Sequence, residues 1–118
     1  MRKIPPILPA VSWFVITTIL LCLPGSAFPK ENWFDKIWLD KWVHIGLFTV
    51  LAFFWGGVAK KIRLAIHIAF YCLLYGVAME FIQKYFIPNR SFDPGDIVAD
   101  GIGSILGAFL STKWYIKK

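Results

Sequence analysis

The chain alternates between four long apolar segments and short polar ones. The apolar segments cover approximately residues 7–23, 42–59, 64–83 and 94–114. A helix needs about 20 mostly apolar residues to cross the hydrocarbon core of a bilayer. The pattern therefore predicts an all-α membrane protein, with one domain over residues 1–118 that forms a bundle of four transmembrane helices.

The fourth segment is the weakest of the predicted spans. Its continuous apolar part, residues 97–110, would give only about 21 Å of helix against a hydrocarbon thickness of about 30 Å. To cross the membrane, this helix has to begin near Pro94 and continue toward Trp114. That extension carries Asp96 and Asp100 toward membrane depth.

The region between the first two apolar segments has a different pattern. Over residues 28–41, tryptophans alternate with charged residues, and the apolar positions 34, 37, 38 and 42 follow helical spacing. Such a sequence is typical of a short amphipathic helix that lies in the membrane interface. We predict one here, between spans 1 and 2.

Composition supports a membrane protein and argues against nucleic-acid binding. The chain is 58% hydrophobic and 17% charged, and its net charge is +6. The basic residues lie between the apolar segments and form no basic stripe, so they fit membrane topology better than a nucleic-acid surface. The lipid bilayer is therefore the expected partner, and no nucleic acid is expected.

The basic residues also predict an orientation. With the N-terminus in the cytoplasm, eight of the 13 Lys and Arg residues lie on the cytoplasmic side, so both termini are expected there. A second interpretation of the first segment stays open. Because Gly25, Ser26 and Ala27 are small residues after an apolar run, this segment also resembles a cleaved signal peptide.

The predicted topology brings the start of span 2, the end of span 3 and the start of span 4 to the outer face of the membrane. Ionisable residues inside a membrane segment are costly unless they are paired or functional, so these residues are the candidate site. We expect three of them to handle protons, and five to bind a ligand. The first group is Glu80, Asp100 and His44; the second is Lys41, Arg90, Gln83, Asp40 and Asp96.

Some residues in and near this candidate site have a structural interpretation. Asp93 followed by Pro94 is typical of a helix N-cap and first helical position. Arg90 has two interpretations, as the partner of an internal carboxylate or as a ligand for a phosphate. Glycines at 101, 103 and 107 predict a small-residue face that packs against another helix. No tight metal-ligand motif occurs, and we predict neither a metal nor a cofactor.

Taken together, these motifs resemble those of the VanZ-like family of small multi-pass bacterial membrane proteins. The resemblance covers about residues 40–107 and rests on the patterns Asp40-Lys41-x-x-His44, Glu80-x-x-Gln83 and Arg90-x-x-Asp93-x-x-Asp96-x-x-x-Asp100. It implies a location in the bacterial cytoplasmic membrane, and the family's namesake is associated with teicoplanin resistance. The family usually has Asn where this chain has Asp100.

Three functions are compatible with this sequence. In the first, the outer cluster binds or processes a cell-envelope molecule such as a lipid-linked glycan, whether or not it is an enzyme. In the second, the buried acids carry protons for a transporter or flippase of an envelope lipid. In the third, the protein is a non-catalytic member of an envelope complex.

Overall fold

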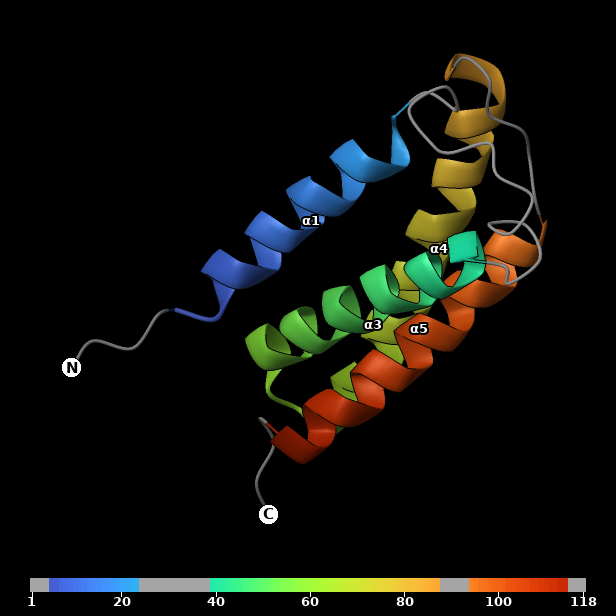
Figure 1. Ribbon diagram of the computed structural model, residues 1–118. Helices are drawn as coiled ribbons and strands as arrows, with labels where there is room; N and C mark the ends of the chain where they lie inside the picture. The colour runs from blue at the N-terminus through green and yellow to red at the C-terminus, as the bar shows by residue number, and fades with distance from the viewer. Residues whose placement is uncertain (1–4, 24–38, 88–93, 115–118) are drawn as a thin grey trace.

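Four helices make up the fold. The computed structural model describes residues 5–23, 39–87 and 94–114. Its helices are α1 (Ile7–Leu21), α3 (Leu39–Ala59), α4 (Ile62–Phe86) and α5 (Pro94–Trp114) (Figure 1). The predicted all-α fold is confirmed. The amphipathic helix expected over 28–41 falls largely outside the described residues, and its last three positions belong to α3.

Two of the four helices meet the length and hydropathy expected of a membrane span. They are α3, over Lys41–Ala59, and α4, over Ile62–Phe86. Helix α1 is apolar but has only 15 residues, which is about 22 Å of helix at 1.5 Å per residue. Helix α5 has 21 residues but includes Asp96, Asp100 and Lys113. The structure thus supports two spans, and the crossing of the membrane by α1 and α5 stays a prediction.

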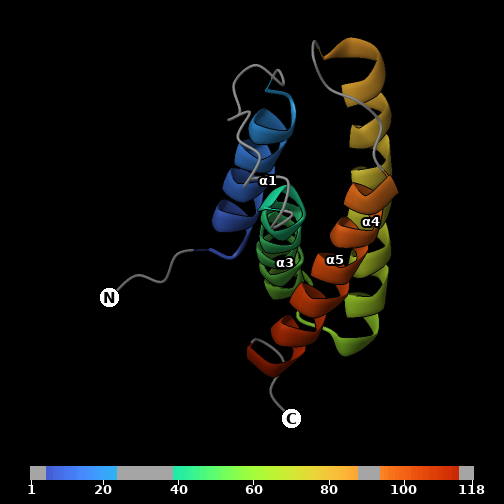
Figure 2. The ribbon, with the colours of Figure 1, turned by 45° about the vertical axis from the view of Figure 1, so that its right-hand side comes forward.

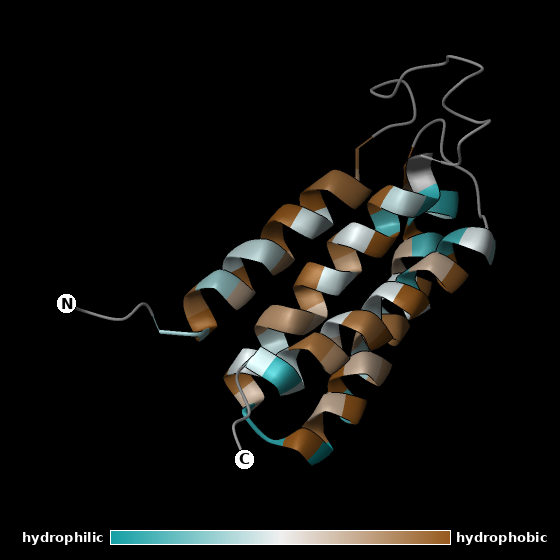
Figure 3. Ribbon diagram, turned by 60° about the horizontal axis from the view of Figure 1, so that its bottom comes forward, coloured by the Kyte–Doolittle hydropathy of each residue, from teal (hydrophilic) through white to brown (hydrophobic). Residues whose placement is uncertain are grey.

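The distribution of side chains also indicates a membrane environment. Large apolar side chains are exposed on all four helices, including Ile66 at 76% and Ile105 at 67%. By contrast, Glu80 and Asp100 are each only 1% exposed. In Figure 3 the hydrophobic colour covers much of every helix. Apolar residues outside and ionisable residues inside are the arrangement expected of a protein dissolved in lipid.

The helices alternate in direction. In Figures 1 and 2, α1 and α4 run one way, and α3 and α5 run the other way. The beginnings of α3 and α5 therefore lie at the same end of the bundle as the ends of α1 and α4. We call this end the polar end, because Lys41, His44, Asp96 and Asp100 lie there. The predicted meeting of these segments is confirmed.

Helices α3 and α5 form the most extensive interface in the bundle. A Cβ atom added to Gly103 would lie 2.5 Å from the carbonyl oxygen of Ile45, and one added to Gly107 would collide with the carbonyl oxygen of Thr49. These two glycines therefore let the backbones of α5 and α3 come into contact. The prediction of a small-residue packing face is confirmed for both positions.

Hydrogen bonds attach helix α1 to both α3 and α4. The indole Nε1 of Trp13 donates a hydrogen bond of 3.0 Å to the carbonyl oxygen of Leu47 on α3. At the polar end, Nε2 of Gln83 on α4 donates a 2.7 Å bond to the carbonyl oxygen of Leu21. Carbonyl groups in the last turn of a helix have no partner within the helix, so Gln83 satisfies one of them.

Candidate functional site

A buried polar cluster lies at the polar end, between α3 and α5. It consists of four side chains, two from each helix, and the sequence had identified all of them as candidates. They are Lys41 and His44 from the first turns of α3, and Asp96 and Asp100 from the first turns of α5. Because α3 and α5 run in the same direction, the N-terminal turns of both helices supply the site.

The deepest contact in the cluster joins His44 to Asp100. The imidazole Nδ1 lies 2.7 Å from Oδ1 of Asp100, which is a short hydrogen-bond distance. Both side chains are buried, at 7% and 1% exposure. A histidine and a carboxylate that share a bond in an apolar bundle are a strongly coupled pair, because little water is present to weaken their attraction.

Asp96 lies one helical turn closer to the polar end and bridges Lys41 and His44. Its Oδ1 is 3.0 Å from the ammonium nitrogen of Lys41. Its Oδ2 is 3.7 Å from Nε2 of His44, which is longer than a hydrogen bond. Asp96 and Asp100 thus contact the same imidazole, because their four-residue spacing places them on one face of α5. Lysine, aspartate, histidine and aspartate form one continuous series of charged or titratable groups.

A glycine on α4 makes room for the deepest carboxylate. A Cβ atom added to Gly76 would lie 2.5 Å from Oδ2 of Asp100 and 3.0 Å from its Cγ. Helix α4 therefore closes the site from the third side, and only a residue without a side chain leaves space there. Gly76 was not among the candidate residues identified from the sequence. An isolated glycine inside a helical apolar segment was the available signal, because such a glycine often marks a close approach.

Glu80 lies one turn beyond Gly76 on α4. It is 1% exposed, and its four-residue spacing from Gly76 places it on the same side of the helix. The expectation that Glu80 is deeply placed is confirmed. Its role in proton handling stays a prediction.

Of the remaining candidates, the structure describes the side chain of Gln83 only. Gln83 is 1% exposed, and its amide is engaged with the end of α1, so a structural role accounts for its burial. Asp40 belongs to α3, but its side chain lies outside the described part of the chain. Arg90 and Asp93 also lie outside it. Helix α5 does begin at Pro94, as the capping pattern predicted.

The contacts of His44 define what this site can do chemically. When Asp100 is ionised it can only accept hydrogen bonds, so Nδ1 of His44 carries the proton. In a neutral imidazole, Nε2 is then the basic nitrogen, and it points toward Asp96 and the polar end. A buried carboxylate that orients an imidazole in this way prepares it to accept or donate a proton. Lys41, with a side chain 23% exposed, places a positive charge at the outer side of the same site.

The site shows no sign of a metal centre within the described residues. In those parts of the chain, no group of three or more His, Cys, Asp or Glu side chains is arranged to hold a metal ion.

Comparison with known proteins assigns the family. The model of the VanZ/LLP1 family matches residues 8–115, which is nearly the whole chain. The chain belongs to the VanZ/LLP1 family. No curated protein and no solved structure is significantly similar to it.

At position 100, this chain differs from what the family resemblance implies. The resemblance to VanZ-like sequences implies an asparagine there, whereas this VanZ/LLP1 chain has Asp100. An asparagine Oδ1 would accept the same hydrogen bond from Nδ1 of His44, but without the negative charge. In this chain, therefore, position 100 supplies both the hydrogen-bond acceptor and a titratable group.

Proposed function

We propose that this VanZ/LLP1 protein is an integral protein of the bacterial cytoplasmic membrane, with both termini in the cytoplasm, and that its polar end faces outward and binds or processes a cell-envelope molecule. The observation that carries this proposal is the buried hydrogen bond between His44 and Asp100. Burial of an ionisable pair in a lipid-exposed bundle is costly, so a functional role is the default interpretation of such a pair.

The charges of the site favour a ligand that has both hydroxyl groups and an anionic group. Asp96, nearer the polar end, is an acceptor for hydroxyl hydrogens, and Lys41 attracts a phosphate or carboxylate. A lipid-linked glycan or a glycerol-containing phospholipid has both features. In this proposal His44 moves a proton to or from the bound group, with Asp100 holding its ring in place.

The direct test compares cells that lack the protein with cells that carry His44→Ala, by profiling all envelope lipids and cell-wall precursors. We expect the His44→Ala profile to match that of the deletion while the protein still accumulates in the membrane. His67→Ala is the matched control, because His67 is exposed and its Nδ1 bonds the carbonyl oxygen of Arg63 on its own helix. A wild-type profile in cells with membrane-inserted His44→Ala protein would refute the proposal.

Asp100→Asn gives a finer test of the same site. It keeps an acceptor for Nδ1 of His44 and removes the charge. If the envelope profile is retained, Asp100 positions the histidine and takes no part in proton transfer. If the profile is lost although the protein accumulates, the charge at position 100 is required.

A proton-coupled transporter or flippase is the second candidate. The observation that favours it is the continuous series Lys41, Asp96, His44 and Asp100, which leads from a partly exposed ammonium to a carboxylate that is 1% exposed. Such series carry protons in membrane pumps. Transport predicts that the envelope change depends on the proton gradient, so an uncoupler should reproduce the deletion profile within minutes in wild-type cells and have no further effect in the deletion.

A further inference from the structure

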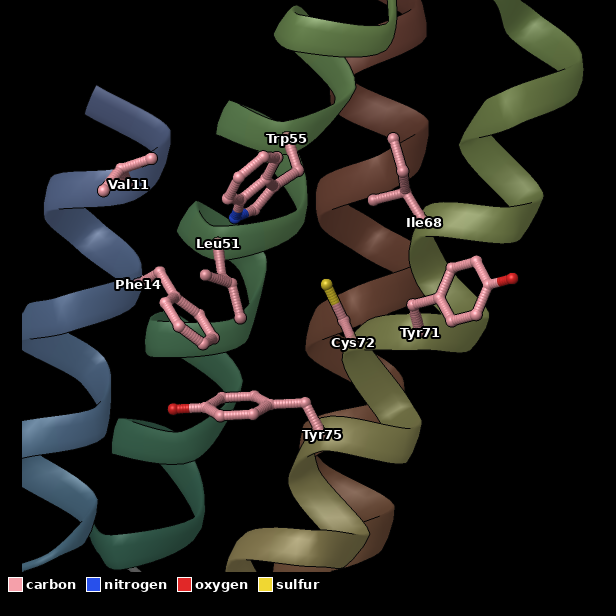
Figure 4. A pocket seen from close by; sticks show the side chains of 8 residues that line it. All are labelled: Val11, Phe14, Leu51, Trp55, Ile68, Tyr71, Cys72 and Tyr75. Atoms are coloured by element: carbon pink, nitrogen blue, oxygen red, sulfur yellow. The ribbon is translucent and has the colours of Figure 1, made fainter. Parts of the chain in front are cut away.

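Helices α1 and α4 leave an open apolar groove between them, with α3 as its floor. The groove has a volume of about 480 Å³, within the range of about 300–1,000 Å³ typical of small-molecule sites. Figure 4 shows side chains from the three helices around it. Those used below are Val11 and Phe14 of α1, Leu51 and Trp55 of α3, and Ile68 and Tyr75 of α4.

The lining suits a hydrocarbon chain. Apolar side chains and aromatic rings make up nearly all of the groove surface. The hydroxyl of Tyr75, which extends from α4 across α3, is hydrogen-bonded to Thr18 of α1 at 2.5 Å. That hydroxyl is therefore already engaged, and the ring of Tyr75 presents its carbon atoms to the groove. An open apolar groove on a membrane protein gives a lipid tail access from the bilayer side.

One face of α3 connects the groove to the polar site. Positions 41, 44, 48, 51 and 55 are separated by three or four residues, so they follow one face of the helix. Along about 21 Å of α3, this face changes from a lysine and a histidine, through Phe48, to the leucine and tryptophan of the groove floor. The side chains along this face thus change from polar to apolar in the same order as a lipid does from its head group to its tail.

A series of packed aromatic rings lies between the two sites. Phe48 stacks on the imidazole of His44, with ring centroids 6.5 Å apart and planes 5° from parallel. It also contacts Tyr75, at 5.8 Å between centroids. Tyr75 in turn contacts Phe14 of α1 at 5.1 Å. The fully buried ring of Phe48 thus lies between the polar site and the groove, so a ligand that reaches both sites must displace this ring.

We propose that the groove between α1 and α4 binds the hydrocarbon chain of the same envelope molecule whose head lies at His44 and Lys41. The ligand is then an amphiphile: a long-chain phosphate ester with a hydroxyl-bearing head group. This inference rests on the proposed function of the polar site and adds the chemical class of its substrate. It also assigns a role to α1, which contributes none of the four side chains of the polar cluster.

The test uses the full chain in phosphatidylcholine nanodiscs that contain a small fraction of phosphatidylglycerol with a photoreactive diazirine in one acyl chain. After irradiation, the labelled peptides are identified by mass spectrometry. We expect groove positions on α1 and α4 to be labelled more than the exposed side of α4 around Ile66, and an excess of unlabelled phosphatidylglycerol to displace the groove label.

Two matched variants separate groove binding from general contact with lipid. Ile68→Trp fills the groove, and Ile66→Trp makes the same change on the same helix at a side chain that is 76% exposed. We expect Ile68→Trp to lower displaceable labelling in the groove about tenfold and Ile66→Trp to leave it unchanged. His44→Ala should also lower it, because the head group then loses its contact.

Each result decides the inference. Equal effects of the two tryptophan variants, or groove labelling no greater than at Ile66, would show ordinary lipid contact and overturn it. If displaceable labelling is unchanged in His44→Ala, the lipid site is unconnected to the polar cluster, and this result would also overturn the inference. If Ile68→Trp changes the oligomeric mass and not the labelling, a second copy of the chain fills the groove instead.

Failure of the inference is distinguishable from failure of the proposed function. The envelope profile of His44→Ala cells tests the polar site alone. If that profile changes but the groove does not bind the probe specifically, the polar site stands and the groove inference falls.

Discussion

Two regions around α3 are packed in different ways. In the α3–α5 interface, which we call the closed side, α5 lies so close that Gly103 and Gly107 meet backbone atoms of α3, and Asp100 is enclosed with His44. In the groove, which we call the open side, α1 and α4 stand apart. Enclosure is required where charges are held without water, because their interaction is strong only at low dielectric. Where only apolar side chains meet, an open groove costs little in a membrane, since lipid can fill it.

The largest effect should come from breaking the polar pair on the closed side. His44→Ala leaves the carboxylate of Asp100 buried without its 2.7 Å partner, and removing one member of a buried ion pair costs about 3–5 kcal/mol. We expect a correspondingly lower unfolding free energy in detergent. The double variant His44→Ala, Asp100→Ala should recover part of the loss, which a double-mutant cycle measures. Simple additivity of the two single losses would contradict the coupling described here.

The next effect tests how close the helices on the closed side must be. In Gly107→Ala, the added methyl group collides with the backbone oxygen of Thr49, which can move only if α5 shifts. Overpacking of this kind costs about 1–3 kcal/mol. Thermal unfolding of the purified protein checks this value. Gly46→Ala is the control, because the new Cβ would meet nothing within 4 Å, and it should leave stability unchanged or raise it.

A smaller change in stability, with a larger change in function, is expected at the boundary between the two sides. Gly76→Ala places a methyl group against the Asp100 carboxylate, which is the movable end of a side chain. We expect a loss of about 1 kcal/mol or less in stability together with an altered envelope profile, because His44 loses its orienting contact. Histidine ring signals in nuclear magnetic resonance spectra should shift in this variant. A wild-type His44 signal would show that Asp100 has not been displaced.

The smallest effect should be on the open side. Tyr75→Phe removes the hydroxyl that joins α4 to Thr18 of α1 across the groove. A single hydrogen bond of this kind contributes about 0.5–1.5 kcal/mol. Thermal unfolding measures the stability, and the envelope profile should stay as in the wild type. A loss as large as that of His44→Ala would mean that the two sides do not differ in the way described.

The candidate site was largely readable from the sequence because charge inside an apolar segment is rare and costly. Lys41, His44, Asp96 and Asp100 were all identified on that ground. Because successive spans cross the membrane in opposite directions, the sequence also predicted which helix ends meet. Family membership followed from the same residues and their spacing.

Other features depended on side-chain geometry that periodicity does not contain. The sequence did not indicate which carboxylate bonds His44. In the structure Asp100, from a different helix, supplies the 2.7 Å contact. The sequence also did not indicate that the Gln83 amide is bonded to the end of α1, and its role in ligand binding stays a prediction. Spacing along one helix cannot rank partners that come from another.

The sequence alone thus determined the helical class, the family and the set of buried charges, because apolar segment length and the cost of intramembrane charge act locally along the chain. Only the tertiary structure decided that His44 bonds Asp100, that Gly76 makes room for this carboxylate, and that a groove opens between α1 and α4. Each of these depends on how closely two helices approach. That distance is set by side chains that are far apart in the sequence.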